Sequence, residues 1–481
     1  MQEKLVFSHI AQVSQHIAAP VYVVGGFVRD QLLGKPTKKD IDCMVDGSGI
    51  VFAKAFAALF TEEEGRLVEF ADFDTARYIF LDRENNNEIF LEVEFAGARK
   101  ESYETGSRKP IVEQTSVEED LSRRDFTVNA MAQKIEKDGT LGIIIDPFGG
   151  KKDLEKGVLK TPKNPDETFF DDPLRMLRAA RFAAQLNFSI DPNTLTAMHT
   201  NRKRLSIISA ERVQEELIKL LAAPVPSIGL TLLFQTKLLD ECLPEITDLS
   251  GVEEMKGYMH KDNFTHTLAV VDTIATYSPK PLLRLAALLH DVAKPQTKKF
   301  LHGRGWTFDM HEHLGKKMAK DIMRRLKFSR QDVWYVSELV RWHLQPIALT
   351  DEGVTDSAVR RLIVNLGDLL PDLLHLCRSD ITTGNQQKKV RRLKNYDYLE
   401  KRIAEVIETD QLRAFQSPVR GEEIMQLCGL KPGPTIGKIK KELERAILDG
   451  EVPNDHDRVL EYFYSMKDRY LAEGEDWEKI S

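Results

Sequence analysis

Cysteine is scarce in this sequence, and neither charge is in strong excess. The 481 residues include only four cysteines, and no two of them form a CxxC pair. This spacing argues against a zinc ribbon or a disulfide framework. The net charge of −7 does not indicate a nucleic-acid-binding protein, because such proteins usually carry a basic excess. Any contact with RNA must therefore come from local basic patches.

Long apolar runs are also missing. With 42% hydrophobic and 30% charged residues, and no apolar run of about 18 residues, the composition predicts a globular protein without a membrane span. The segment MQEKLVFSHI lacks the basic head, apolar middle and cleavage site of a secretory signal. We therefore expect a cytoplasmic protein. The length exceeds that of most single-core domains, which predicts several domains.

The pattern of apolar residues changes near residue 150. Before it, short β-rich runs such as VYVVGG, DIDCMV and EIFLEVEF alternate with helical stretches. After it, segments such as AERVQEELIKLLAA carry apolar residues at helical spacing. The sequence thus predicts an α+β fold, in which an N-terminal part with a mixed sheet precedes an almost entirely helical remainder.

A glycine pair lies between an apolar run and a predicted helix. Gly25 and Gly26 follow VYVV, and the helix after them carries Arg29. Glycines allow the backbone to approach a phosphate, while the helix N-terminus and an arginine attract its charge. A plain tight turn explains the two glycines at least as well when they are taken alone.

Two aspartates lie on the next predicted strand, KDIDCMV. Because Asp40 and Asp42 are two residues apart, their side chains project from one strand face. Neighbouring carboxylates repel each other, and a divalent cation such as Mg²⁺ relieves that repulsion. The alternative is an exposed strand edge with two solvated aspartates.

The order of these and later motifs resembles one enzyme family. GGFVRD followed by DID resembles the catalytic signature of class II tRNA nucleotidyltransferases and bacterial poly(A) polymerases, which belong to the DNA polymerase β-like superfamily. Further segments are similar to the family's remaining motifs, in the family's order: 118–132, 146–162, 171–188 and 209–221. The resemblance implies a polymerase β-like catalytic head, an all-α neck, an HD domain and a helical tail.

The resemblance also implies roles for the acids of the head. Asp40 and Asp42 would hold the Mg²⁺ ions that bridge the nucleotide phosphates and activate the RNA 3′-hydroxyl. Glu94 is expected to be a third catalytic carboxylate, with Glu92 on the same strand face as the less favoured choice. Nucleotide binding is assigned to the glycine turn and the RRD motif, namely Gly25, Gly26, Arg29, Arg124, Asp125 and Asn129.

A third motif is expected to read the bases of CTP and ATP. Asp172 and Arg175 stand where the family's EDxxR motif places an acid and an arginine that mimic a complementary base. Asp171 departs from the pattern, because the family usually has glutamate there. Arg178 and Arg181 continue the same helical stripe and are included in the predicted nucleotide site. A surface stripe of ion pairs is the alternative.

Histidines and aspartates between about 260 and 385 resemble an HD phosphohydrolase domain. The implied metal ligands are His266, His290, Asp291 and Asp380, with His311 and His343 as ligands of a possible second metal. Imidazole and carboxylate ligands suit Mn, Ni, Fe or Mg, and the sequence does not choose among these metals. Hydrolytic activity stays open at this point.

The C-terminal part carries two candidate RNA-binding segments. Residues 386–402 form a basic run in which Tyr396 and Tyr398 are placed to stack on bases or sugars. A solvated helix face explains this run equally well. The segment GLKPGPTIGKIKKELERAILDG resembles the family's tail and carries Lys438, Lys440 and Lys441.

The resemblance, together with these patterns, implies four domains and one activity. The domains are a catalytic head (1–150), a neck for base recognition and RNA binding (151–250), an HD domain (251–385) and a tRNA-binding tail (386–481). The predicted activity is that of a CCA tRNA nucleotidyltransferase, which adds C, C and A to tRNA from CTP and ATP. A-only addition, poly(A) synthesis and HD-type hydrolysis at RNA 3′ ends are the alternatives. In the family that the chain resembles, CC-only enzymes typically have a shortened loop where this chain has GARKESYETGSRKPIVEQTSVEED, which disfavours CC-only addition. Poly(A) polymerases of the family usually carry a strongly basic C-terminal extension, and the acidic LAEGEDWEKIS disfavours that alternative. The oligomeric state cannot be predicted.

Overall fold

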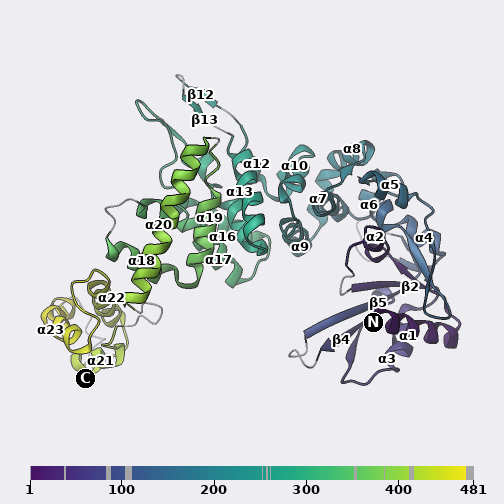
Figure 1. The fold of residues 1–481 in the computed structure, drawn as a ribbon, viewed down its shortest axis with the longest axis horizontal. Coiled ribbons are helices and arrows are strands. Elements are labelled where there is room, and N and C mark those ends of the chain that lie inside the picture. The colour runs from purple at the N-terminus through teal and green to yellow at the C-terminus, as the bar shows by residue number, and fades with distance from the viewer. Residues whose placement is uncertain are drawn as a thin grey trace. The chain divides into compact units, whose positions relative to one another are not determined.

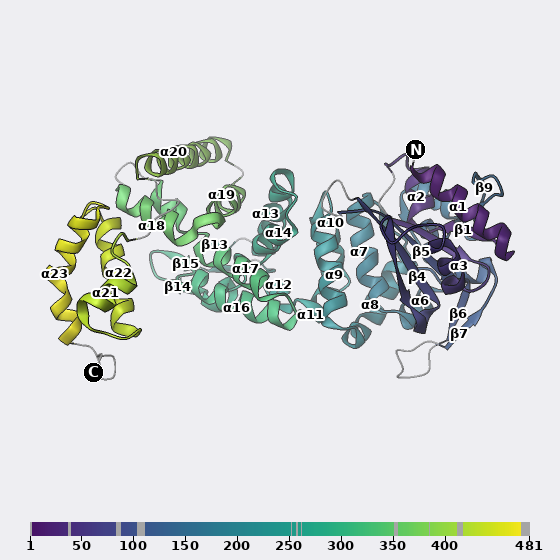
Figure 2. The same ribbon diagram turned by 90° about the horizontal axis from the view of Figure 1, so that it is seen from below.

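The computed structural model of the chain describes residues 2–36, 40–82, 88–102, 111–251, 253–255, 258–260, 262–350, 355–383, 385–410 and 417–472. Contacts divide the chain into two compact units, Met1–Thr247 and Asp248–Ser481. Figures 1 and 2 label the helices and strands of both units. Each unit is described by itself.

A seven-stranded mixed sheet forms the head within the first unit. Its strand order is β3-β4-β5-β2-β1-β8-β9. The strands are β1 (Val21–Val24), β2 (Asp40–Val45), β3 (Gly65–Phe70), β4 (Thr75–Asp82), β5 (Glu88–Gly97), β8 (Ala132–Ile135) and β9 (Leu141–Ile145). The pair β2 and β5 is parallel, and the other neighbours in this sheet are antiparallel. A separate hairpin consists of β6 (Arg99–Ser102) and β7 (Ile111–Gln114).

The two faces of β2 differ in chemistry. Ile41, Cys43 and Val45 are buried in a core that also contains residues of α1 (Gln2–Ile17) and α3 (Gly49–Ala57). Asp40 and Asp42 alternate with them and are exposed. The period of two along a strand therefore directs the hydrophobic side chains to the core and both carboxylates to the opposite face.

The remainder of the first unit is mostly helical. Two of the helices are short and belong to the head, α2 (Gly26–Leu32) and α4 (Val117–Ser122). The neck contains α5 (Gly150–Lys156), α6 (Pro165–Asp171), α7 (Leu174–Leu186), α8 (Pro192–Asn201), α9 (Ala210–Leu221), α10 (Pro226–Gln235), α11 (Leu238–Cys242) and α12 (Pro244–Thr247). The short strands β10 (Val158–Leu159) and β11 (Ser189–Ile190) pair beside them.

The second unit is built from helices with two small hairpins. Its first part contains β12 (Glu253–Met255), β13 (Tyr258–His260), α13 (Asn263–Tyr277), α14 (Pro281–Leu289), α15 (Lys294–Thr297), β14 (Lys299–Leu301), β15 (Gly305–Thr307), α16 (His311–Arg325), α17 (Arg330–Trp342), α18 (Asp356–Leu366) and α19 (Leu370–Ser379). Its last part contains α20 (Gln386–Asp410), α21 (Gly421–Cys428), α22 (Pro434–Leu448) and α23 (His456–Ala472).

The predicted fold class is confirmed. A mixed sheet occupies the N-terminal part, and helices dominate from α5 onward. The four-domain division stays a prediction, since the contacts separate two units. Among the described helices, none combines the length and the apolar character that a membrane crossing needs.

Candidate active site and metal centre

Four carboxylates lie together on the exposed face of β2 and β5. The parallel pairing sets Asp40 opposite Glu92 and Asp42 opposite Glu94. Because residues two apart share a strand face, all four side chains start from the same side of the sheet. The predicted adjacency of Asp40 and Asp42 is confirmed, and the register brings both predicted glutamates beside them.

Arg77 from β4 balances part of this negative charge. Its Nη1 lies 3.0 Å from Glu92 Oε2, and its Nη2 lies 2.8 Å from Glu94 Oε2. Asp42 is less well compensated: surrounding protein atoms and Glu94 raise the pKa of Asp42, although Arg124 acts in the opposite direction. The carboxylate face is therefore short of positive charge, which is a condition that a bound divalent cation relieves.

Asp40 and Asp42 line a pocket of about 130 Å³ together with Gly26. In the described part of the chain, Asp40, Asp42 and Glu94 do not bring three ligand atoms together, and Glu94 contacts Arg77. Mg²⁺ commonly takes one or two protein carboxylates and completes its octahedral shell with substrate phosphates and water. The two aspartates fit that mode of binding.

The glycine turn brings the next motif close to this pocket. Gly25 precedes α2 with φ of +70°, a left-handed conformation that favours glycine. A Cβ at this position would lie 3.1 Å from Arg124 Nη1 and 3.9 Å from Asp42 Oδ2. Gly25 therefore provides the space in which the Arg124 guanidinium approaches the carboxylate face.

Replacing Gly25 with alanine is expected to lower nucleotide addition about 10- to 100-fold by displacing Arg124. The left-handed backbone adds about 1–2 kcal/mol of strain for a residue with a Cβ. Gly34→Ala is the matched control, because Gly34 has φ of +64° but a Cβ there would meet no atom of the described residues within 4 Å. Single-turnover rates and thermal unfolding would separate the two effects, and equal rate losses in both variants would contradict this role of Gly25.

Asp120 forms ion pairs with both arginines of the RRD motif, Arg123 and Arg124. It is 2% exposed, and its Oδ1 accepts from Arg123 Nη2 at 2.5 Å while its Oδ2 accepts from Arg124 Nη2 at 3.1 Å. Burial alone would raise the pKa of Asp120, but the two arginines outweigh it and lower that pKa. Asp120 is thus ionised and fixes the direction of the predicted nucleotide-binding residue Arg124.

The motif that is predicted to read the base begins where α6 ends. Asp172 lies between α6 and α7: its Oδ1 accepts from Leu174 N at 3.1 Å, and its Oδ2 accepts from Arg212 Nη2 at 3.0 Å. Arg175 donates to Thr168 O at 3.3 Å and lines a pocket of about 260 Å³ with Arg123. Asp172 and Arg175 therefore lie near one another, with Arg212 as an unpredicted partner of the acid.

The other residues that are predicted to bind the nucleotide form hydrogen bonds or ion pairs with protein side chains. Arg29 is 3% exposed and contacts Asp30 and Asn129. Arg178 contacts Asp125, and Arg181 is 8% exposed with its Nε 2.8 Å from Glu216 Oε2. Their assignment to the nucleotide stays a prediction, because these contacts already engage the guanidinium groups.

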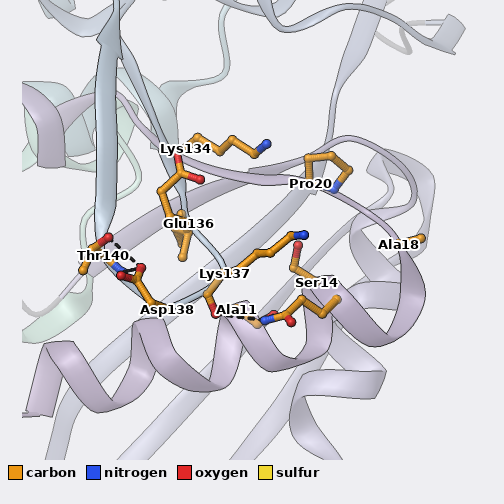
Figure 3. A pocket seen from close by; sticks show the side chains of 11 residues that line it. Ala11, Ser14, Ala18, Pro20, Lys134, Glu136, Lys137, Asp138 and Thr140 are labelled. Carbon is orange, nitrogen blue, oxygen red and sulfur yellow. Dashed lines mark hydrogen bonds between the residues drawn. The ribbon is translucent and has the colours of Figure 1, made fainter.

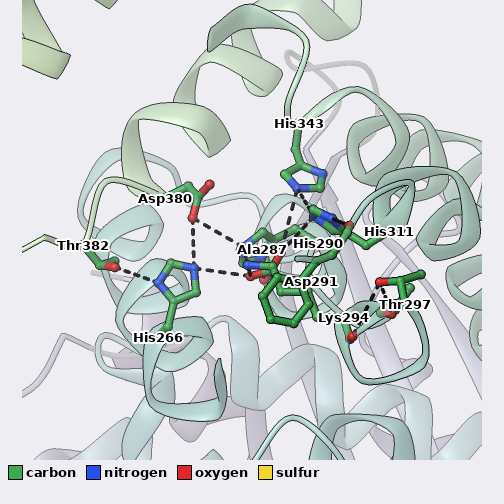
Figure 4. A network of polar contacts seen from close by, with 12 residues as sticks. His266, Ala287, His290, Asp291, Lys294, Thr297, His311, His343, Asp380 and Thr382 are labelled. Atoms are coloured by element: carbon green, nitrogen blue, oxygen red, sulfur yellow. Dashed lines mark hydrogen bonds and ion pairs between the residues drawn. The ribbon is translucent and has the colours of Figure 1, made fainter. Parts of the chain in front are cut away.

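The second unit gathers the six predicted HD ligands into two adjacent groups (Figure 4). The first group contains His266, His290 and Asp380, and the second contains Asp291, His311 and His343. Within each group, the potential ligand atoms all lie within 4.8 Å of one another. The ligands come from α13, the C-termini of α14, α17 and α19, and the start of α16.

Asp291 connects the two groups. Its Oδ2 lies 3.2 Å from His290 Nε2 and 3.5 Å from His266 Nε2. Its Oδ1 lies 3.4 Å from His311 Nε2 and 3.9 Å from His343 Nε2. The sequence placed Asp291 with the first metal only, whereas this geometry directs one oxygen to each group.

Backbone carbonyls orient the imidazoles of this centre. The Nδ1 atoms of His290, His311 and His343 lie 2.7, 2.8 and 2.7 Å from the carbonyls of Ala287, Phe308 and Val340, respectively. Donation from Nδ1 leaves Nε2 as the ring atom that would bind a metal, which takes the place of any proton there. Among the described residues, His290 Nε2 is also buried without a hydrogen bond of good geometry. The donor set therefore fits a divalent transition metal.

Charge differs between the two groups. Burial lowers the pKa of His290, but Asp291 and Asp380 outweigh burial and raise it to about 10. Burial and the neighbouring His290 lower the pKa of His343 to about 4. Lys294 Nζ lies 2.6 Å from Asp291 Oδ2 and adds a cation that the sequence motifs did not single out.

A larger cavity, of about 860 Å³, lies between α1 and the turn that joins β8 to β9 (Figure 3). Its polar groups are mostly engaged locally: Gln15 donates to Lys137 O, Ser14 donates to Ala19 O, and Thr140 donates to Asp138. No predicted site residue lines this cavity. Its size alone does not make it a catalytic site.

Comparison with known proteins places these motifs in a family. Residues 21–160 match the poly(A) polymerase head domain, 187–249 a probable RNA- and SrmB-binding site of that polymerase, 263–400 the HD domain, and 372–463 a putative second domain of tRNA nucleotidyltransferases. The A-adding tRNA nucleotidyltransferase of Deinococcus radiodurans is 33% identical over 354 residues, which cover 70% of this chain and 76% of that protein. The chain belongs to the tRNA nucleotidyltransferase family.

Other members of the tRNA nucleotidyltransferase family carry different specificities. The CC-adding tRNA nucleotidyltransferase of Thermus thermophilus is 35% identical over 347 residues, or 70% of this chain and 74% of that protein. A crystal structure of the Bacillus stearothermophilus CCA-adding enzyme with CTP shares the fold, with a TM-score of 0.68 and 21% identity over 98% of this chain and 100% of that one. Family membership therefore leaves the number of added nucleotides open.

Three residues of this tRNA nucleotidyltransferase site were missed by sequence reasoning. Asp120 could have been found, since it lies four residues before Arg124, a spacing at which an acid and a base meet if the segment is helical. Arg77 and Arg212 had no local signal, because their partners are distant in the chain. Tertiary folding alone brings them to the site.

One predicted RNA contact of the tail is wrong. Tyr396 is 3% exposed, since it lies on the face of α20 that buries Leu399, Ile403 and Val406. It therefore cannot stack on a base in this conformation. Tyr398 points outward with 43% exposure, so the proposed stacking is restricted to this residue.

Proposed function

We propose that this protein adds C, C and A to the 3′ end of tRNA from CTP and ATP and releases pyrophosphate. The observation that carries the proposal is the register of β2 and β5, which assembles Asp40, Asp42 and Glu94 on one face beside the Gly25 turn and Arg124. Family membership and the CCA-adding structural neighbour support tRNA as the substrate.

The predicted site residues would have separate roles in nucleotide addition. Asp40 and Asp42 would hold Mg²⁺, which supplies charge neutralisation and a more acidic RNA 3′-hydroxyl when bound. Arg124, clamped by Asp120, would bind the triphosphate, and Asp172 with Arg175 would present donors and acceptors to the base. Positioning and charge stabilisation account for most of the catalysis in phosphoryl transfer.

A primer-extension assay tests this proposal. The protein is incubated with Mg²⁺, CTP and ATP and with tRNA transcripts that lack the terminal CCA, end in CC, or carry the complete end, and the products are sequenced. Addition of three, one and zero nucleotides is expected. Addition of A to the CC transcript alone would indicate an A-adding enzyme, and unlimited adenosine would indicate a poly(A) polymerase. The segment that is expected to disfavour CC-only addition includes residues 103–110, which lie outside the described residues. The acidic segment that is expected to disfavour a poly(A) polymerase includes residues 473–481, which also lie outside them.

The HD centre supports a second activity. Two ligand groups that share Asp291 suit metal-assisted hydrolysis of a phosphate ester, for which a metal supplies an activated water. We propose a phosphate group at an RNA 3′ end as its substrate. The HD domain match supports a metal centre but not the identity of its metal.

A further inference from the structure

A basic hairpin lies between two helices that contribute to the HD centre. Residues 292–308 contain no aspartate or glutamate, and their lysines and arginines are Lys294, Lys298, Lys299 and Arg304. Strands β14 and β15 pair within this segment, and residues 298–307 are called the basic hairpin from here on. Because the whole chain has a net charge of −7, this is a local concentration of positive charge. Such a concentration is the usual basis of contacts with nucleic-acid phosphates.

Both ends of the basic hairpin are fixed at the metal centre. Before it, Lys294 Nζ lies 2.6 Å from Asp291 Oδ2 (Figure 4). After it, Phe308 O lies 2.8 Å from His311 Nδ1. The two ends also meet, since Lys294 Nζ lies 5.7 Å from the centroid of the Phe308 ring. The hairpin therefore starts and finishes beside Asp291 and His311, which belong to the second ligand group.

The two faces of the basic hairpin differ in chemistry. Phe300 and Trp306 are cross-strand partners with ring centroids 5.3 Å apart, and both are half-buried. Lys299 precedes Phe300 on β14, so its side chain starts from the opposite, exposed face. Arg304 is exposed in the turn between the strands. Among the described residues, neither Lys299 nor Arg304 forms an ion pair with an acid, so both charges are available to a ligand.

These two cations lie within reach of a strand that ends at the metal centre. Lys299 follows Lys294 by five residues, and an extended chain advances by at most about 3.6 Å per residue, so their Cα atoms lie within about 18 Å of each other. Arg304 precedes Phe308 by four residues, which limits that separation to about 14 Å. Single-strand binding sites commonly take about four nucleotides or more. A short RNA strand can therefore contact the centre and the hairpin at once.

We propose that the basic hairpin binds the phosphate backbone of an RNA strand whose 3′-phosphate is hydrolysed at the HD centre. This inference rests on the hydrolytic activity proposed for that centre. In the reaction, water attacks phosphorus and the bond from phosphorus to the 3′-oxygen breaks. The 3′-oxygen takes up a proton from the water, and inorganic phosphate is released. Lys299 and Arg304 contact phosphates upstream of the reacting one, so an oligonucleotide is preferred over a mononucleotide.

A comparison of substrate lengths tests the inference. Phosphate release from an oligoribonucleotide of about ten residues with a 3′-phosphate is compared with release from a nucleoside 3′-monophosphate, with Mn²⁺, Ni²⁺ or Mg²⁺ added. The wild type should have the lower KM for the oligonucleotide. In the double variant Lys299→Gln/Arg304→Gln, kcat/KM for the oligonucleotide should fall about 10- to 30-fold at about 0.1 M salt, since each lost phosphate contact removes a factor of about five. The loss should lie in KM, and the mononucleotide values should not change.

Salt dependence and a control variant give independent readouts. For the double variant, the slope of the logarithm of kcat/KM against the logarithm of salt concentration should become shallower by about 1.4, because each single-strand contact contributes about 0.7. Arg324→Gln/Arg330→Gln is the control. It removes the same charge from exposed positions that lie about 20 Å along α16 and α17 from the metal centre. The control should keep the wild-type preference and slope.

Two kinetic results would overturn the inference. An unchanged preference for the oligonucleotide in Lys299→Gln/Arg304→Gln would show that the basic hairpin does not contact the strand. An equal loss of kcat/KM on both substrates would show an effect on the metal centre instead of on strand binding.

Failure of the proposed hydrolysis would be recognised separately. If the wild-type protein released no phosphate with any of these metals, the proposed activity would be wrong. An oligoribonucleotide with a thiouridine next to its 3′-phosphate would then be photo-crosslinked to the full chain, and the crosslinked peptides identified by mass spectrometry. Crosslinks within residues 294–311 that decrease in Lys299→Gln/Arg304→Gln would still support strand binding by the hairpin. Crosslinks elsewhere only, or crosslinks that the substitutions leave unchanged, would refute it.

Discussion

Asp42→Asn and Asp40→Asn are each expected to lower nucleotide addition at least about a thousandfold. A metal ion stabilises a phosphoryl-transfer transition state by several kcal/mol, and each 1.36 kcal/mol corresponds to a factor of about ten in rate. Asparagine keeps the shape of the side chain but removes the charge that attracts Mg²⁺. Single-turnover extension of tRNA with CTP, at several Mg²⁺ concentrations, measures the effect.

The fold is expected to survive the change at Asp42. Because the surrounding protein atoms and Glu94 raise the pKa of Asp42, ionised Asp42 destabilises the folded state at neutral pH in the absence of metal. A neutral isostere removes that destabilisation. The unfolding temperature should therefore stay equal or rise. A loss of activity with a lower unfolding temperature would indicate misfolding and would not support a ligand role.

Substitutions at Glu92 and Glu94 test which of the two is the third catalytic carboxylate. Glu94→Gln is expected to reduce addition much more than Glu92→Gln, since Glu94 is the register partner of Asp42, although Arg77 contacts both. Glu69→Gln is the matched control, because Glu69 lies on the same sheet and pairs with Lys54 at its surface. Equal losses at positions 92 and 94 would contradict the assignment of the third carboxylate, and near-wild-type addition by Asp40→Asn would remove Asp40 from the mechanism.

Asp291→Asn is expected to reduce hydrolysis of a phosphate ester at the HD centre by about a thousandfold and to leave tRNA extension unchanged. Asp291 supplies one oxygen to each ligand group, so its neutralisation weakens both metal positions at once. The nucleotidyltransferase carboxylates belong to the other compact unit. Release of phosphate and opening of a cyclic phosphate, each with Mn²⁺, Ni²⁺ or Mg²⁺ added, measure the effect.

The stability change should have the opposite sign to that of Asp42→Asn. Burial would raise the pKa of Asp291, yet His290 and Lys294 outweigh it and lower that pKa strongly, so the ionised form supports folding. If Asp291→Asn fails to fold, His343→Gln tests the second ligand group in its place. Hydrolysis that persists unchanged in both variants, or that is absent from the wild type with every metal, would refute the proposed second activity.

Local periodicity accounts for what the sequence predicted well. Asp40 and Asp42 share a face because strand side chains alternate. The apolar Ile41, Cys43 and Val45 must face the core, so both aspartates face away from it. The HD ligands were located by their family resemblance. The pairing of His311 with His343 in a second group was also predicted, but the place of Asp291 between the two groups was not, because it depends on how the ends of four helices converge on Asp291.

Long-range pairing accounts for what the sequence did not predict. Arg29 is predicted to bind a phosphate from its place after two glycines, but its hydrogen bond to Asn129, 100 residues away in the chain, was not predicted. The ion pair between Arg178 and Asp125 was not predicted either. The prediction that Tyr396 stacks on RNA was wrong because a basic run suggests an exposed helix. The helical spacing of Tyr396 with the buried Leu399 and Ile403 instead places the tyrosine on the packed side of α20.

The parallel pairing of β2 with β5 also bears on how the head folds. Asp42 and Glu94 are separated by roughly fifty residues, and contacts of such separation form late because the intervening loop must first be closed. The local hairpin of β3 and β4 can form early and then deliver β5 to its place beside β2. The cluster of Asp40, Asp42, Glu92 and Glu94 therefore needs β5 to be synthesised before it can assemble.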